Sequence, residues 1–286
     1  MPAGTTLVHA AGRVGSPEYR SPVKTVRIND VDLAFDSAGE GPGTLVLVHG
    51  FTGSSIDWTD VVPLLAPHVE VVTYDHRGHG NSTNTGDEAT YTFAQLVDDL
   101  AGFVAAIGLT EPFHLLGHSM GGMVAMRWAL AHQEQLRSLI LMDTGAEPLT
   151  AAEKMFAPMV ELASTRGMGA IAAAMEQVAP VPAGARGDEI RRRNRWKLEH
   201  MDPAAFIGLG RDIGRAPGVL DRLSQLELPT TVLVGENDTP FVDISAKMTT
   251  SIPGAEQVTF AGAGHCPQED DPARWTEAVL AHLRRA

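Results

Sequence analysis

The sequence has little cysteine, comparatively few basic residues and no long apolar run. Cys266 is the single cysteine among 286 residues, so the chain cannot form a disulfide bond with itself. This scarcity suits a reducing compartment, and we expect a cytoplasmic protein. No stretch approaches the roughly 18 apolar residues that a helix needs to span a bilayer, so we expect no membrane partner.

Basic residues are in the minority. The chain has 22 lysines and arginines against 35 aspartates and glutamates, and its formal net charge is −13. Such an acidic surface repels the phosphate backbone of nucleic acids, so nucleic acid is not an expected partner. The hydrophobic residues, at 44%, are enough to form a large buried core.

Short apolar runs rich in β-branched residues predict the strands of one sheet. These runs are Thr25–Ile28, Val31–Phe35, Thr44–His49, Val69–Tyr74, Phe113–His118, Ser138–Met142, Thr230–Val234 and Glu256–Phe260. Several are apolar at nearly every position, which is typical of strands buried on both faces of a parallel sheet. Helical patterns at Thr92–Ile107 and Met120–His132 alternate with them. We therefore predict an α/β fold with a doubly wound, mostly parallel, eight-stranded sheet.

The alternation of strands and helices stops after Met142 and resumes at Thr230. Most of the sequence between them is helical in pattern and contains no convincing strand, so we predict an inserted helical cap. The predicted parts are a flexible tail at 1–22, a core domain made of 23–145 and 216–286, and a cap at 146–215. The tail lacks the basic and apolar regions of a signal peptide. A helical cap of this kind lies over the active site of an enzyme. Large cap side chains are therefore candidates to line a substrate cavity, namely Met155, Met159 and Trp196.

The sharpest chemical signal is Gly117-His118-Ser119-Met120-Gly121, which has the pattern of a nucleophile elbow. An apolar strand precedes the motif and an apolar helix follows it, so the turn would hold the Ser119 hydroxyl above the sheet. The N–H of Met120 stands at a helix N-terminus, where it favours a negatively charged oxygen. The loop His49–Gly53 follows another strand and is placed to supply a second such donor.

A serine hydroxyl needs a base, and the base needs a carboxylate to orient it. His265 follows the last predicted strand, within Gly262-Ala263-Gly264-His265, and Asp238 follows the strand before it. Both would lie at the carboxyl edge of the sheet, where sites form in open α/β folds. We predict Ser119 as nucleophile, His265 as base and Asp238 as the supporting acid. Glu236 competes with Asp238 for that role, but it lies closer to its strand and is interpreted as structural.

Other polar clusters have simpler interpretations. The turn that begins with Asp75 carries His76 and His79, but no second cluster completes a coordination sphere, so we predict no metal. We expect its aspartate and arginine to be hydrogen-bonded within the fold. The basic run Arg191–Arg195 is interpreted as a solvated helix face, and Cys266 as a structural residue.

Five motifs follow predicted strands: HGFTGSSIDW (49–58), DHRGHGNS (75–82), GHSMGG (117–122), GENDTPF (235–241) and GAGHCPQEDDP (262–272). Together they resemble the α/β-hydrolase superfamily, in particular its small capped bacterial members, from Val26 to His282. The resemblance implies the chain order Ser, Asp, His and an oxyanion hole formed by the amides of Phe51 and Met120. In some relatives the acid stands at the position of Asp143, so that alternative stays open.

The resemblance implies a serine hydrolase that cleaves a small, largely apolar ester or lactone without a cofactor. The same frame in relatives also serves C–C bond hydrolases and cofactor-free perhydrolases. A nucleophilic serine argues against the dehalogenase and epoxide hydrolase branches, which carry aspartate there. A ligand receptor that retains the triad, and a lyase or synthase, are further alternatives. The oligomeric state does not follow from the sequence.

Overall fold

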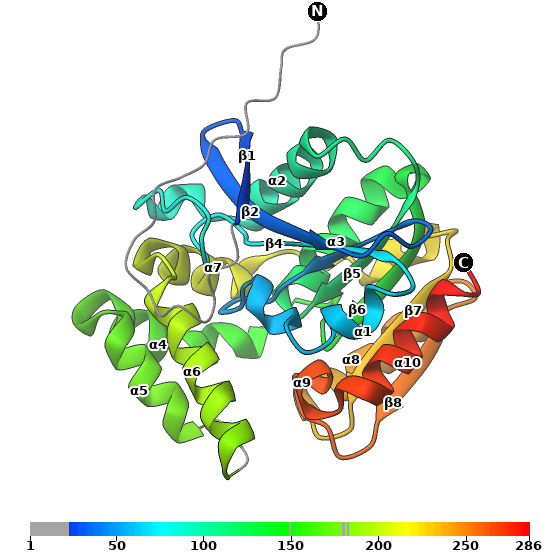
Figure 1. The fold of residues 1–286 in the computed structure, drawn as a ribbon. Helices are drawn as coiled ribbons and strands as arrows, with labels where there is room; N and C mark the ends of the chain where they lie inside the picture. The colour runs from blue at the N-terminus through cyan, green and yellow to red at the C-terminus, as the bar shows by residue number, and fades with distance from the viewer. Residues whose placement is uncertain (1–22, 149, 179–180, 182) are drawn as a thin grey trace, which may run out of the picture.

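A single mixed sheet runs through the centre of the molecule (Figure 1). The structure is a computed structural model and describes residues 23–148, 150–178, 181 and 183–286, so the predicted tail at 1–22 lies outside it. Within these residues the sheet has eight strands in the order β1-β2-β4-β3-β5-β6-β7-β8. The strands are β1 Lys24–Ile28, β2 Val31–Ala38, β3 Thr44–Val48, β4 Glu70–Tyr74, β5 Phe113–His118, β6 Leu136–Met142, β7 Thr230–Gly235 and β8 Glu256–Phe260.

The pairing follows the predicted pattern. β1 and β2 form an antiparallel hairpin, β2 pairs antiparallel with β4, and all other neighbours are parallel. The predicted fold class is confirmed. The largest difference at a strand end is β2, which continues to Ala38 because its polar end pairs with β4 as far as Val71. That extension has no apolar signal, since Asp36 and Ser37 belong to it.

Helices cover both faces of the sheet, and each face has its own apolar core. Successive side chains of a strand point to opposite faces, and β3 shows this directly. Leu45 and Leu47 pack with Trp58 and Trp275 on one face, whereas Val46 packs on the other. The helices outside the insertion are α1 Val62–Leu65, α2 Phe93–Ala106, α3 Met120–His132, α8 Thr239–Ser251, α9 Pro267–Asp270 and α10 Pro272–Leu283.

Between β6 and β7 the chain forms a group of helices to one side of the sheet (Figure 1). They are α4 Thr150–Arg166, α5 Met168–Val178, α6 Ala185–Glu199 and α7 Pro203–Arg215. α4 packs mainly on α7, while α5 connects α4 to α6. The predicted bounds 146–215 enclose these helices, and their role as a separate cap domain stays a prediction.

None of the helices in the described part of the chain combines the length and the apolar character needed to cross a bilayer.

Candidate active site

Ser119 occupies a strained turn between β5 and α3. Its φ of 55° and ψ of −120° are unusual for a side chain-bearing residue, and its N–H donates to the Met142 carbonyl at 2.9 Å. The flanking glycines are needed because the backbone is crowded. A Cβ at Gly121 would lie 2.4 Å from the Val48 carbonyl oxygen, and one at Gly117 would lie 2.4 Å from the Gly121 oxygen. The turn predicted from the motif is therefore the conformation that the chain adopts.

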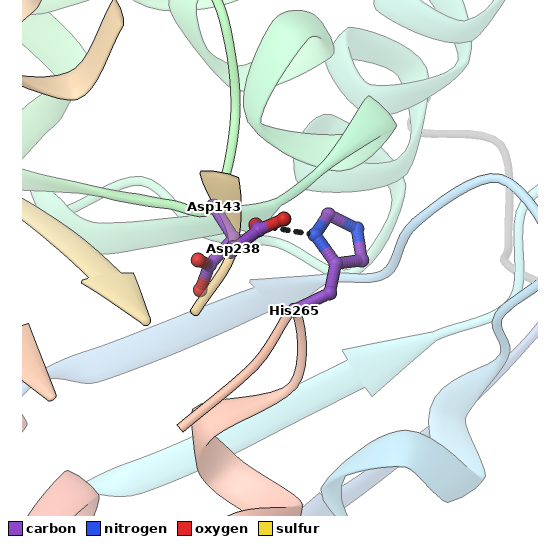
Figure 2. Close-up of side chains that lie close together, drawn as sticks. All are labelled: Asp143, Asp238 and His265. Carbon is purple, nitrogen blue, oxygen red and sulfur yellow. Dashed lines mark hydrogen bonds and ion pairs between the residues drawn. The ribbon is translucent and has the colours of Figure 1, made fainter. Parts of the chain in front are cut away.

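His265 joins Ser119 to Asp238. Its Nε2 lies 3.0 Å from Ser119 Oγ, and its Nδ1 lies 2.7 Å from Asp238 Oδ2. An aspartate carboxylate accepts a hydrogen bond from Nδ1–H, which leaves the lone pair of Nε2 free to accept a hydrogen bond from the serine hydroxyl. Figure 2 shows Asp238 facing the ring, with the hydrogen bond between them dashed. The geometry thus brings the three predicted residues into one hydrogen-bonded chain.

Close contacts between loops hold Asp238 and His265 in place. β7 ends against the His265 loop so tightly that a Cβ at Gly235 would lie 2.0 Å from the Gly264 carbonyl oxygen. The N–H of Asn237 donates to the Ala263 carbonyl at 2.9 Å. These contacts hold the carboxyl ends of β7 and β8 against each other, and Asp238 and His265 follow those ends.

Two residues that the sequence did not single out support His265. His118 Nε2 donates to the His265 carbonyl at 2.8 Å, and the Phe241 ring stacks on the imidazole with 5.2 Å between ring centres. Burial, followed by the charge of His265, lowers the pKa of His118 to about 3, so this ring stays neutral. His118 stands inside the elbow motif and Phe241 inside GENDTPF, but nothing in their spacing indicates these contacts.

Asp143, the alternative acid, lies beside Asp238 and is not joined to the ring in Figure 2. It is buried, has a φ of 45°, and its Oδ1 accepts a hydrogen bond from the Gly235 N–H at 2.9 Å. Burial raises the pKa of Asp143 to about 9; the Gly235 N–H partly offsets this, and neighbouring Asp238 adds to it. Asp238 is therefore the carboxylate in contact with the imidazole, and Asp143 is a neutral neighbour at pH 7.

The raised pKa of Asp143 predicts how stability depends on pH. Its unfolded pKa is near 3.8, so between pH 4 and about 9 the folded protein holds a proton that the unfolded chain releases. The folded state binds more protons in this window, so stability falls as pH rises through it. Asp143→Asn removes this loss, and urea unfolding should show the variant gaining relative to wild type from pH 5 to 8.5. Parallel stability curves would contradict a neutral Asp143.

The residues predicted for the oxyanion hole lie against Ser119. Phe51 and Met120 are both buried and line the same cavity as the serine. A Cβ at Gly50 would lie 3.1 Å from the Ser119 Cβ, so the loop after β3 passes directly beside Ser119. Phe51 and Met120 thus stand in segments that border Ser119.

Buried histidines hold the loop that carries Phe51. His79 Nε2 lies 2.6 Å from the Phe51 carbonyl oxygen. His49 Nδ1 donates to the Gly50 carbonyl at 2.8 Å, while its Nε2 accepts from the His76 N–H at 3.0 Å. Burial, followed by the charge of His79, lowers the pKa of His49 to about 3. A buried, neutral ring with both nitrogens hydrogen-bonded makes His49 a structural histidine of this loop.

A cavity of about 640 Å³ opens onto this chain of residues. Its apolar lining comes from the core and the inserted helices and includes Met123, Phe156, Met159, Met175, Phe206, Ile213 and Phe241. Of the three predicted cap residues, Met159 faces the cavity, and the side chain of Met155 lies outside the described residues.

Trp196 requires a correction. It is absent from the cavity lining in the described part of the chain, and its ring stacks on His200 at 4.1 Å instead. Residues four apart on a helix lie on the same face, and neither Trp196 nor His200 is among the described residues that line the cavity. Lys197, the next residue, lines the cavity in its place.

Comparison with known proteins identifies the family. Residues 45–278, most of the chain, match the Alpha/beta hydrolase family. The chain belongs to this family. Over 260 residues it is 32% identical to a pimeloyl-[acyl-carrier protein] methyl ester esterase of Aeromonas hydrophila subsp. hydrophila, covering 87% of this chain and 98% of the relative.

Solved structures place this α/β hydrolase among known folds. A thermophilic esterase from Thermogutta terrifontis superposes with a TM-score of 0.78 and is 30% identical, covering 89% of this chain and 94% of its own. The enol-lactonase from Burkholderia xenovorans LB400 superposes with a TM-score of 0.80, covering 91% and 99%, and at 24% identity it shows the fold alone. The chain is thus a member of a family of hydrolases.

The DHRGHG turn of this α/β hydrolase is structural, as predicted. Asp75 accepts hydrogen bonds from the N–H groups of Ser55 at 2.6 Å and Asn81 at 2.8 Å, and buried Arg77 pairs with Asp99 at 2.5 Å.

Among the residues that the structure describes, one group lies close enough together to hold a metal ion. It consists of Asp143, Asp238 and His265, whose candidate ligand atoms lie within 4.8 Å of one another. In this group His265 Nδ1 is hydrogen-bonded to Asp238 Oδ2 at 2.7 Å.

Proposed function

We propose that this chain is a serine hydrolase that cleaves a carboxylic ester or lactone of a small, largely apolar substrate. The observation that carries the proposal is the hydrogen-bonded chain from Ser119 through His265 to Asp238, which opens on an apolar cavity. The similar esterases support an ester bond as the target. Helices α4 to α7 act as the cap, because α4 and α7 contribute Phe156, Met159 and Phe206 to that cavity.

The mechanism has two acyl-transfer steps. His265 Nε2 takes the proton of Ser119 as the oxygen attacks the ester carbonyl, and Asp238 stabilises the positive imidazole. The amides of Phe51 and Met120 donate to the tetrahedral oxyanion, and each such donor is typically worth about 3 kcal/mol. The imidazolium then protonates the departing alcohol. Water, activated by the same ring, releases the acid and regenerates the serine.

A time course of p-nitrophenyl butyrate hydrolysis tests this function. We expect sustained release over many turnovers and complete inhibition by a p-nitrophenyl alkylphosphonate, because the activated serine attacks phosphorus as it attacks a carbonyl. Mass spectrometry of the inhibited protein should find the adduct on Ser119. A single equivalent of product would indicate a receptor that retains the triad. Labelling of Ser119 without ester turnover would favour lyase or synthase chemistry.

A further inference from the structure

One cationic side chain faces the apolar cavity. Among the described residues that line it, Lys197 alone carries an ammonium or guanidinium group, and its side chain is only 11% exposed. It reaches the cavity from α6, and its Nζ lies 2.5 Å from Asp57 Oδ1. Asp57 is also buried, at 7% exposure, and its Oδ2 accepts a hydrogen bond from the Ser54 N–H at 3.2 Å.

The Lys197–Asp57 pair is ionised. Burial by itself would lower the pKa of Lys197, but the attraction of Asp57, and then of Glu269, more than offsets it, so the pKa is raised. Burial likewise opposes ionisation of Asp57, but Lys197 outweighs it and lowers the pKa. An ammonium group has three N–H donors and no acceptor. The bond to Asp57 uses one of them.

Other ion pairs anchor the same helix, so Lys197 is not the sole link between α6 and the core. Arg193 pairs with both Asp60 oxygens, at 2.7 and 3.0 Å, and Arg186 contacts Asp60 at 2.7 Å. The predicted solvated face of α6 is therefore correct for Arg191, Arg192 and Arg195 but wrong for Arg193, which is buried. Neither Arg186 nor Arg193 belongs to the described cavity lining, whereas Lys197 does.

The charge balance around Lys197 decides which kind of substrate group its ammonium can bind. Asp57 already neutralises Lys197, and Glu269, whose pKa is raised mainly by burial, stands nearby. A bound substrate displaces water from the site, so a substrate carboxylate would be buried there as an unpaired negative charge. Burial of an unpaired charge is unfavourable in free energy. A neutral oxygen acceptor adds no charge and gains a charge-assisted hydrogen bond.

We propose that Lys197 Nζ is a specificity-determining donor that binds a second, neutral oxygen acceptor of the substrate. The preferred substrate is then an ester or lactone with an apolar body and a ketone, ether, hydroxyl or further ester oxygen in addition to the scissile carbonyl. This inference rests on the proposed function and narrows its substrate class.

Matched substrate pairs test the inference. Each pair differs by one oxygen: ethyl 5-oxohexanoate against ethyl hexanoate places it in the acyl part, and 2-methoxyethyl hexanoate against butyl hexanoate places it in the alcohol part. We expect wild type to favour at least one oxygenated partner. Lys197→Met should lower that preference in kcat/KM about tenfold, since a hydrogen bond to a charged donor is worth roughly that factor. Arg193→Met, which breaks an ion pair of the same helix away from the cavity, should leave the ratio unchanged.

Binding provides a readout that does not require turnover. The same ligands, with monoethyl adipate as the carboxylate, are titrated by calorimetry into Ser119→Ala with and without Lys197→Met. If the loss of Lys197 prevents folding by leaving Asp57 unpaired, the double variant Asp57→Asn, Lys197→Met removes both charges.

The outcomes separate the two proposals. A binding ratio that is insensitive to Lys197→Met overturns the inference, as does a kcat/KM ratio that Arg193→Met lowers as much as Lys197→Met. A preference for the carboxylate ligand also overturns it. A folded wild type that hydrolyses none of these esters overturns the proposed function, while the ratio of dissociation constants still decides the role of Lys197.

Discussion

Replacing Ser119 with alanine is expected to lower kcat for p-nitrophenyl butyrate by roughly 10⁴-fold or more, with the fold retained. The hydroxyl oxygen lies 3.0 Å from His265 Nε2, and alanine offers no atom that attacks the carbonyl. The turn itself is unaffected, because alanine carries the same Cβ at the same φ of 55°. Steady-state kinetics measure the loss, and circular dichroism with urea unfolding checks the fold.

Cys266 provides the matched control for the proposed nucleophile, Ser119. It lines the same cavity, next in sequence to His265, but burial raises the pKa of its thiol, which therefore stays protonated and unreactive. Cys266→Ala should retain activity within about tenfold of wild type, the cost of a changed cavity wall. The nucleophile would be wrongly assigned if Ser119→Ala kept its esterase activity, or if Cys266→Ala lost more activity than Ser119→Ala.

The substitutions Asp238→Asn and Asp143→Asn should have very different effects on kcat. Asp238→Asn removes the carboxylate that accepts from His265 Nδ1 and lets the ring adopt the other tautomer, so we expect kcat to fall by about 10³- to 10⁴-fold. Asp143→Asn exchanges one neutral group for another of the same shape, because the Asp143 carboxyl is protonated at pH 7. Its kcat should stay within a few-fold of wild type.

The two variants are best compared across pH 6 to 9 on one substrate. Equal losses in both would mean that the two carboxylates act as one unit, and a larger loss in Asp143→Asn would make Asp143 the orienting acid. Addition of formate or acetate is a further check. A small carboxylate that restores part of the activity of a smaller Asp238→Ala variant would support the role of a negative charge at this position.

The fold could be predicted because its signals are local. Buried parallel strands such as β3 and β5 are apolar at nearly every position, and their ends were correct to within one residue. The proximity of Ser119, Asp238 and His265 could be predicted for the same reason: each follows a strand, and parallel strands bring their carboxyl ends to one edge of the sheet. Their catalytic roles stay a prediction. A short sequence window contains the information for each of these positions.

The lining of the cavity could not be predicted because it depends on how distant helices pack. Trp196 and Lys197 are neighbours in the chain, yet only the lysine faces the cavity. The side chains of Lys197 and Arg193 contact Asp57 and Asp60, which lie more than a hundred residues earlier in the chain. Arg193 illustrates the same limit, since nothing in a run of four arginines distinguishes the buried member from its exposed neighbours.

The ion pairs of α6 have a consequence for recombination between relatives. Asp57 and Asp60 belong to the core segment after β3, whereas their partners Lys197 and Arg193 arrive with the insertion. An insertion exchanged for that of another hydrolase would leave buried Asp57 and half-buried Asp60 without cations unless the incoming helix supplied them at matching positions. An unpaired buried charge, such as that of Asp57, is strongly destabilising. Chimeras in this family should therefore exchange helices α4 to α7 and the Ser54–Asp60 segment together, from the same parent protein.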